Sequence, residues 1–357
     1  MAASENSSTL PGASGESLTG PAARRPAHLD ATGRFRTVAR YALALCFVVV
    51  VLGAWVRLTD AGLGCPDWPG CYGKIVVPGG EAAEAAAAAY PERPLEVGKA
   101  WREMIHRYAA GALGLLVFAL GWLAVRNRHT PGQPVILPLF LCGLIIFQAL
   151  LGMWTVTLLL KPLIVMAHLM GGMTTLAILG WLALPDRGDE PWVLGGLRFL
   201  GVLALLVTAT QIALGGWVST NYAALACPDF PTCQTRWVPD MDFATGFKPW
   251  HGLGIDYEGG VLHNSARVAI HVSHRIGAVI TLLIVGWAAL AFRRRSGTVA
   301  LEKAAVFVGL ALAAQIAIGI AIVKLSLPLP LATAHNGMAA LLLLSLVNLN
   351  KVAWRAN

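Results

Sequence analysis

The chain has 357 residues, of which 56% are hydrophobic and only 13% are charged, with a mean hydropathy of +0.64. This composition excludes a soluble globule of the same size, which needs more polar surface, and it predicts an integral membrane protein in contact with the lipid bilayer. The formal net charge of +8 follows the pattern of membrane topology described below, so it requires no nucleic-acid partner.

The chain begins with a segment rich in Ser, Gly, Pro and Ala. Residues 1–36 contain no long apolar run, and they are predicted to form a disordered cytoplasmic tail. The charged stretch from Arg34 to Arg40 leads directly into an apolar run that is long enough to span a bilayer. We therefore expect an uncleaved membrane anchor rather than a cleaved signal peptide.

Eight apolar segments follow, each long enough to cross a hydrocarbon core of roughly 30 Å. They cover residues 38–58, 105–125, 135–157, 164–184, 197–218, 271–292, 304–324 and 331–350. These runs lack the alternation of polar and apolar residues that barrel strands show, so helices are expected. The predicted fold class is an all-α integral membrane protein with eight transmembrane helices.

The basic residues predict the orientation of these helices. They precede the first span and follow the second, sixth and eighth spans; they are Arg34, Arg36, Arg40, Arg126, Arg128, Arg293, Arg294, Arg295, Lys351 and Arg355. Because basic loops remain in the cytoplasm, both termini are expected inside. The two long connections, after the first and fifth spans, then lie outside the inner (plasma) membrane.

The sequence repeats with a period of roughly 165 residues. We expect an N-terminal four-helix half at 37–184, a cytoplasmic linker at 185–196 and a C-terminal four-helix half at 197–353. Because each half has an even number of spans, the repeat is expected to be parallel. The matched positions are Trp55 with Trp217, Gln148 with Gln315, His106 with His274, and His168 with His335.

Each half places two histidines at similar depth on neighbouring helices. These pairs are His106 with His168 and His274 with His335. An imidazole inside a membrane bundle is costly unless it is paired or coordinated, and two facing imidazoles can occupy both axial positions of a haem iron. The sequence therefore predicts one haem in each half, towards the outer side. A hydrogen-bonded interior histidine is the alternative for any one of them.

Charged residues accompany these histidines. Arg107 and Arg275 each follow a histidine directly and could bind a haem propionate or extend to the membrane interface. Glu103 lies one turn before His106, whereas the second half has His271 at the matching position. An ionisable carboxylate beside a predicted haem ligand is a candidate catalytic group. Pairing of Glu103 with Arg102 or Arg107 is the structural alternative.

The two outer loops carry matching cysteine pairs, Cys65 with Cys71 and Cys227 with Cys233. Because both loops are expected in an oxidising compartment, each pair is predicted to form a disulfide within its own loop. A zinc site is a weaker alternative, since two cysteines supply only half of a closed structural site. A redox-active disulfide remains open.

The run Arg57-Leu-Thr-Asp-Ala-Gly-Leu-Gly-Cys65-Pro-Asp-Trp-Pro-Gly-Cys71, followed by Glu103-x-x-His106-Arg107, closely resembles haem A synthase. The resemblance extends over about residues 37–350. It implies oxidation of the C8 methyl group of haem O to a formyl group, which gives haem A for haem-copper oxidases. The implied reaction makes the chain an oxidoreductase.

The resemblance also implies roles for individual residues. His106, His168 and Glu103 belong to the substrate site in the first half, with Glu103 as the catalytic carboxylate. His274 and His335 hold a haem b cofactor in the second half. Haem O is then the substrate, and a haem O synthase and an unidentified electron acceptor are the expected partners.

Two other functional classes remain. A two-haem b-type membrane cytochrome for electron transfer needs the four histidines but gives Glu103 no role. A transporter can also have parallel repeats, but its sites usually lie near the membrane midplane and its helices are usually interrupted.

Overall fold

The computed structural model of the protein describes residues 27–184, 195–295 and 297–354. Eight long helices within these residues are apolar and long enough to cross a membrane, which confirms the predicted fold class. They are α1 (Ala27–Leu58), α3 (Val97–Arg126), α4 (Ile136–Thr157), α5 (Pro162–Ala183), α6 (Gly195–Thr220), α8 (Asn264–Arg295), α9 (Val299–Lys324) and α10 (Leu329–Trp354).

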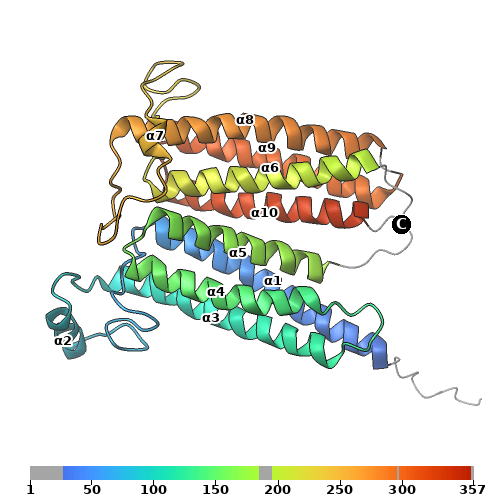
Figure 1. The fold of residues 1–357 in the computed structure, drawn as a ribbon, viewed down its shortest axis with the longest axis horizontal. Helices are drawn as coiled ribbons and strands as arrows, with labels where there is room; N and C mark the ends of the chain where they lie inside the picture. The colour runs from blue at the N-terminus through green and yellow to red at the C-terminus, as the bar shows by residue number, and fades with distance from the viewer. Residues whose placement is uncertain (1–26, 185–194, 296, 355–357) are drawn as a thin grey trace, which may run out of the picture.

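The helices form two groups of four that lie side by side (Figure 1). In the first group α1 packs against α3 and α5, and α4 packs between α3 and α5. In the second group α6 and α9 each pack against α8 and α10. The groups meet where α1 and α5 contact α10 and where α5 contacts α6. Apolar side chains fill this interface, since Ile212 and Leu343 of the second group join the buried core of the first.

Two short helices lie at one end of the bundle, which we call the loop end. Helix α2 (Glu81–Ala89) lies in the connection between α1 and α3, and α7 (Phe243–Gly246) lies between α6 and α8 (Figure 1). Asp242 caps α7 by accepting a hydrogen bond from the backbone N–H of Thr245 at 3.0 Å, as acidic N-cap residues commonly do.

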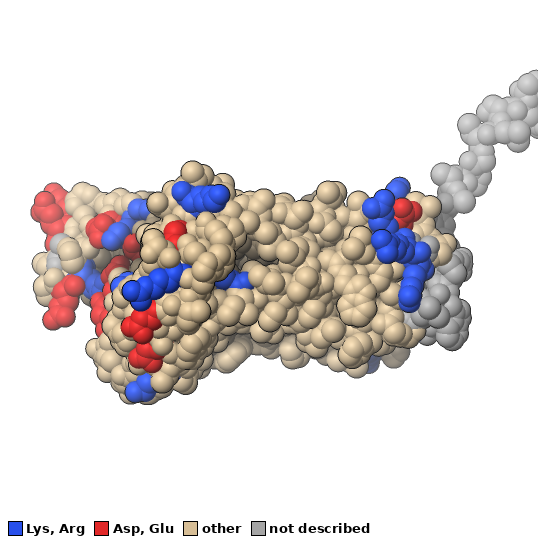
Figure 2. Space-filling view, turned by 90° about the horizontal axis from the view of Figure 1, so that it is seen from above, with Lys and Arg blue, Asp and Glu red and all other residues tan. Residues whose placement is uncertain are grey.

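The outer surface of the helices is strongly apolar. Leu115, Phe199 and Leu283 are 73%, 70% and 65% exposed, which suits contact with lipid. Charged side chains gather at the two ends and are sparse between them (Figure 2). Lys and Arg predominate at one end, while Asp and Glu are mixed with them at the loop end (Figure 2).

The largest differences from the expected boundaries lie at three helix starts. Helix α1 begins at Ala27, so residues 27–36 are helical and do not belong to a disordered tail; residues 1–26 lie outside the described residues. Helices α3 and α8 begin at Val97 and Asn264, several residues before the expected starts at 105 and 271. Hydropathy detects only the apolar part of a helix, and the first turns of both helices contain polar residues. Most of the predicted linker, 185–194, also lies outside the described residues.

Candidate functional site

Both cysteine pairs form the disulfides expected from the sequence, Cys65 with Cys71 and Cys227 with Cys233. The two loops are built alike, since each second cysteine exchanges backbone hydrogen bonds with the residue three positions later. An aspartate fixes each turn. Asp67 accepts the backbone N–H groups of Tyr72 and Gly73 at 2.6 and 2.8 Å.

Asp229 does the same in the second loop, where it accepts the N–H groups of Gln234 and Thr235 at 2.6 and 3.0 Å. The Thr232 hydroxyl and these N–H groups lower the pKa of the Asp229 carboxyl, because each donates to its charged form. The repeat therefore extends from the helices to the fine structure of the loops.

The two arginines that follow a histidine hold these loops. Arg107 donates through Nη1 to the carbonyl oxygen of Asp67 at 2.9 Å and also to that of Gly70. Arg275 donates to the carbonyl oxygens of Thr232 and Asp229, both at 2.7 Å. Each guanidinium thus ties a disulfide loop to the helix that carries a candidate haem ligand.

The two histidines of each predicted pair lie on helices that face each other across a four-helix half, His106 on α3 and His168 on α5, and His274 on α8 and His335 on α10. The expectation of neighbouring helices was wrong, since within the described residues α3 does not contact α5 and α8 does not contact α10. In each half the charge of one imidazole acts on the other. All four residues are only partly exposed. The packing of the helices therefore brings together residues that are about 60 positions apart in the sequence.

The hydrogen bonding of the rings suits a metal ligand. The Nδ1 atoms of His106, His168 and His335 are buried without a hydrogen-bond partner, which is unfavourable for a free imidazole. Within the described residues, no three or more His, Cys, Asp or Glu side chains form a group that could hold a metal ion. Two imidazoles suffice for a haem, because the macrocycle supplies the equatorial ligands. The residues present therefore fit one haem in each half.

Glu103 is 5% exposed and faces the first disulfide loop. Its Oε2 accepts the backbone N–H of Cys65 at 2.9 Å, and its Oε1 pairs with Arg107 one turn later on α3. The pairing with Arg107 that the sequence left open as the structural alternative is thus present. The same contacts hold the carboxylate in one orientation beside His106, as a positioned acid or base requires.

His271 occupies the matching place in the second half and makes a different contact. It is 5% exposed, and its Nδ1 lies 2.9 Å from the carbonyl oxygen of Ala223. One turn before the first histidine of each pair, the first half therefore has a carboxylate, Glu103, and the second half has an imidazole, His271. The disulfide loops and the arginines that bind them are alike in both halves.

A second difference lies beside His274. The Nε2 of Gln211 lies 3.0 Å from Nδ1 of His274 and donates to its backbone oxygen at 2.9 Å. The first half has Val49 at the matching position, six residues before Trp55. Gln211 was missed in the sequence reading, although a polar residue within an apolar span is itself a functional signal.

The paired glutamines of the repeat, Gln148 and Gln315, also differ in their contacts. Gln315 reaches the second pair, with its Nε2 at 3.3 Å from Nε2 of His335. Gln148 is 7% exposed, and its Nε2 is buried without a hydrogen-bond partner. Of these two glutamine side chains, only that of Gln315 makes a hydrogen-bond contact with a candidate ligand, while Gln148 meets His168 through its backbone.

The loop that precedes α8 crosses to the first half. Its Tyr257 donates a backbone hydrogen bond to the carbonyl oxygen of Leu159 at 3.1 Å, and the Tyr257 ring packs in a buried apolar cluster with Leu63, Val156 and Leu160. The structure places this loop over the α4–α5 connection, next to the start of the helix that carries His168.

Lys161, in the α4–α5 connection, binds the same loop. This residue is 2% exposed, donates to the carbonyl oxygen of Gly252 at 2.8 Å and lies against the ring of Trp250. Burial lowers the pKa of its amine, because a low-dielectric surrounding disfavours the charged form. A buried lysine that is not paired with a carboxylate is unusual, and it was not anticipated from the sequence.

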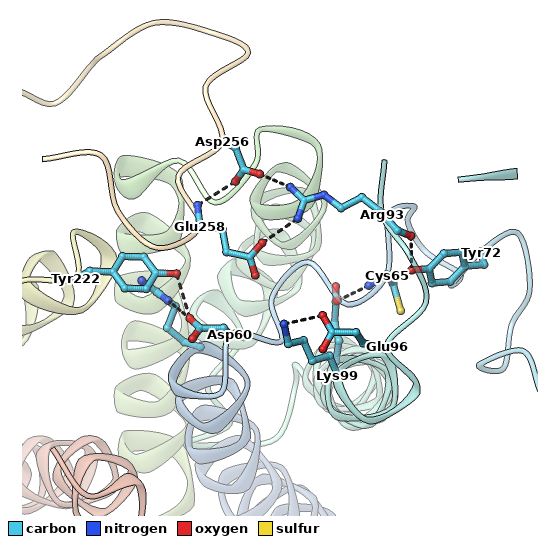
Figure 3. Close-up of polar contacts among 11 residues, drawn as sticks. Asp60, Cys65, Tyr72, Arg93, Glu96, Lys99, Tyr222, Asp256 and Glu258 are labelled. Carbon is cyan, nitrogen blue, oxygen red and sulfur yellow. Dashed lines mark hydrogen bonds and ion pairs between the residues drawn. The ribbon is translucent and has the colours of Figure 1, made fainter. Parts of the chain in front are cut away.

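Ion pairs complete the connection between the halves (Figure 3). Arg93 binds Asp256 at 2.5 Å and Glu258 at 2.8 Å. Tyr222, after α6, donates to Asp60 at 3.1 Å, and Arg57 donates to the carbonyl oxygen of Ser219 at 2.7 Å. The two halves are therefore joined at the loop end by two separate sets of polar contacts.

The chain is similar to known proteins over most of its length. The family profile COX15-CtaA, described as cytochrome oxidase assembly protein, matches residues 36–347. A protein of Shewanella oneidensis named haem A synthase is 45% identical over 322 residues, which is 88% of this chain and 95% of the relative. A haem A synthase of a Methylobacterium species is 30% identical over 353 residues, covering 90% and 94% of the two chains.

Proposed function

The chain belongs to the COX15-CtaA family of cytochrome oxidase assembly proteins, and from this membership we propose that it is a haem A synthase that converts haem O to haem A. The relatives that carry this name cover nearly the whole chain. The proposal makes the protein a multi-pass membrane enzyme that oxidises the C8 methyl group of haem O to a formyl group.

One observation supports an enzyme over a protein that only binds haem. The two halves share histidine pairs, loop arginines and disulfides, yet only the first has a buried carboxylate, Glu103, beside its first histidine. A protein that only transferred electrons through two haems would need no such carboxylate. We therefore assign the substrate to the first half and the cofactor to the second.

In this assignment His106 and His168 hold the iron of haem O, while His274 and His335 hold haem b. A bound haem b supplies one-electron transfer. The contact of Gln211 with Nδ1 of His274 gives the second pair a neighbour that orients a metal-binding imidazole. Gln315 instead lies 3.3 Å from Nε2 of His335, the nitrogen that would bind iron, so its amide would have to leave that atom when haem binds. A cofactor that stays bound benefits from a support such as Gln211 more than a substrate that must leave.

Glu103 is the residue that we assign to proton transfer. With both imidazoles on the substrate iron, no axial position is open to dioxygen, so water is the proposed source of the formyl oxygen. The carboxylate accepts a proton as water adds to the oxidised carbon. Arg107 and the N–H of Cys65 keep the carboxylate oriented. An electron acceptor must take up the electrons, and a haem O synthase in the same membrane supplies the substrate.

The arginines keep a second proposed role. The Nε of Arg275 is buried without a hydrogen-bond partner, so this atom can still donate to a haem propionate. The matching role for Arg107 is a proposal on the repeat alone. Both guanidinium groups lie near the loop end. We place this end on the outer side of the membrane, because Lys and Arg predominate at the opposite end (Figure 2).

Co-expression with a haem O synthase, followed by chromatography of the extracted haems, tests the function. Haem A or a hydroxylated haem O is expected from the wild-type chain. Haem b as the only product would instead favour the alternative, a two-haem membrane cytochrome. The four histidines in two repeated pairs are the observation that supports this alternative.

A further inference from the structure

Each of the four histidines lies against a glycine of a neighbouring helix. The pairs are Gly53 with His106, Gly152 with His168, Gly215 with His274, and Gly319 with His335. In every case the ring atom that faces the glycine is Cε1, the carbon between the two ring nitrogens. The glycines come from α1, α4, α6 and α9, the helices that carry none of the four histidines.

The contact distances show that a side chain at Gly53, Gly215 or Gly319 would crowd the histidine ring, whereas Gly152 leaves ordinary van der Waals space. A Cβ added at Gly319 would lie 3.0 Å from Cε1 of His335, and one added at Gly215 would lie 3.1 Å from Cε1 of His274. Such contacts are shorter than ordinary van der Waals separations between carbon atoms. The ring would have to move to admit a methyl group, and its Nε2 would move with it.

The arrangement repeats in the two halves. Gly53 and Gly215 each stand two residues before a tryptophan, and Gly152 and Gly319 each stand four residues after a glutamine. In the first half, a Cβ added at Gly53 would lie 3.1 Å from Cε1 of His106, and one added at Gly152 would lie 3.5 Å from Cε1 of His168. An accidental contact would not recur at matched positions around both pairs.

Hydrogen bonds do not fix most of these rings. Histidine ligands usually donate their second ring nitrogen to a partner that sets the ring orientation. Here Nδ1 of His335 has no hydrogen-bond partner. The rings of His106 and His168 meet the backbone of Val49 and Gln148, but their Nδ1 atoms make no hydrogen bond of normal geometry. Packing therefore contributes to the orientation of these three rings, and the helix that carries the glycine supplies a close contact at Cε1.

We propose that the glycines at 53, 152, 215 and 319 are positioning residues, each of which sets the angle of one haem-ligating imidazole by close packing. The proposal rests on the proposed binding of a haem by each histidine pair. An alanine at such a glycine tilts the ring and weakens its bond to iron. The effect follows the distances, so Gly319 is the most sensitive position and Gly152 the least.

The test compares Gly319→Ala with Gly309→Ala on the same helix, where an added Cβ would meet its nearest atom only at 4.0 Å. Both changes alter helix propensity equally. The protein is purified with its bound haem, and its optical spectrum and the rate of haem loss to apomyoglobin are measured. Gly319→Ala should increase that rate roughly two- to tenfold, the cost of one off-rotamer side chain, and shift part of the haem from low spin to high spin.

The Gly309→Ala protein should match the wild type. Haem-loaded Gly319→Ala protein with wild-type spectrum and haem loss would overturn the proposal. If Gly319→Ala does not accumulate, Gly215→Ala changes the other ligand of the same pair and decides the question by the same readouts. Wild-type protein without haem would contradict the proposed function itself, which is a distinct result.

Discussion

The two halves of the bundle share their haem-holding parts and differ in the groups around them. Each half has a histidine pair, a disulfide loop and an arginine that binds the loop carbonyls. Only the first has a carboxylate beside its first histidine, and only the second has glutamine side chains in contact with its ligands. A duplicated binding scaffold can thus support two tasks, because a few neighbouring side chains decide whether a haem is altered or retained.

Removing an iron ligand should have the largest effect, because it should remove the haem from one half and leave the other half loaded. We expect His335→Ala to abolish haem b binding in the second half, with a loss of affinity beyond the roughly hundredfold effect of changing a supporting residue. His168→Ala, the matched change, should leave haem b in place and remove haem O. Haem b is measured against haem O and haem A in protein purified after co-expression with a haem O synthase. Full haem b in both His274→Ala and His335→Ala would show that the halves are assigned wrongly.

Glu103→Gln should separate chemistry from binding. The amide keeps the shape of the side chain but cannot accept a proton, so haem A formation should fall on the order of a hundredfold while haem O still binds. Hydroxylated haem O should accumulate if a later oxidation step depends more strongly on the carboxylate. Extracted haems are quantified by chromatography.

His271→Gln is the matched control in the second half, and it should reduce activity much less. Equal and severe losses in both variants would point to a defect in folding or haem insertion. Near wild-type haem A from the Glu103 variant would remove the carboxylate from the mechanism and leave its contact with Arg107 as a purely structural one.

Gln211→Val makes the second half resemble the first, which has Val49 at this position. The Gln211 amide nitrogen lies 3.0 Å from Nδ1 of His274 and donates to the His274 backbone oxygen at 2.9 Å, and valine removes both contacts with the ligand. We expect haem b to be lost to apomyoglobin about tenfold faster from the variant. The haem of the first half should be unaffected, and an unchanged rate of haem b loss would show that this contact does not support the ligand.

Arg93→Ala tests the connection between the halves and should have the smallest effect. Arg93 binds two carboxylates of the other half, but all three side chains are partly exposed. We expect a stability loss of at most about 1 kcal/mol, measured by thermal unfolding in detergent, and a smaller difference at high salt because screening weakens exposed ion pairs.

Lys99→Ala is the control for this change, since its ion pair with Glu96 lies within the first half. A loss of several kcal/mol from Arg93→Ala alone would show that the loop end holds the halves together more strongly than ion pairs of this exposure allow.

Local sequence patterns determined much of the fold. Apolar runs predicted the eight helices, the repeat matched the histidine pairs, and two cysteines in one short loop predicted each disulfide. The errors lie at helix starts, such as α3 and α8, where polar first turns hide a helix from hydropathy. Loop arginines were located but not their contacts, because the carbonyl oxygens that they bind belong to loop residues about 40 positions away in the sequence.

What the sequence by itself determined is the set of chemical groups and their depth in the membrane, because apolar run length and residue spacing are local properties. Only the tertiary structure decided which groups meet. It turned Glu103 towards Cys65, laid the loop around Tyr257 over the first half and set Gly319 against His335. These contacts join different helices and loops, and their geometry depends on how closely the backbones pack, which no pattern within a single segment records.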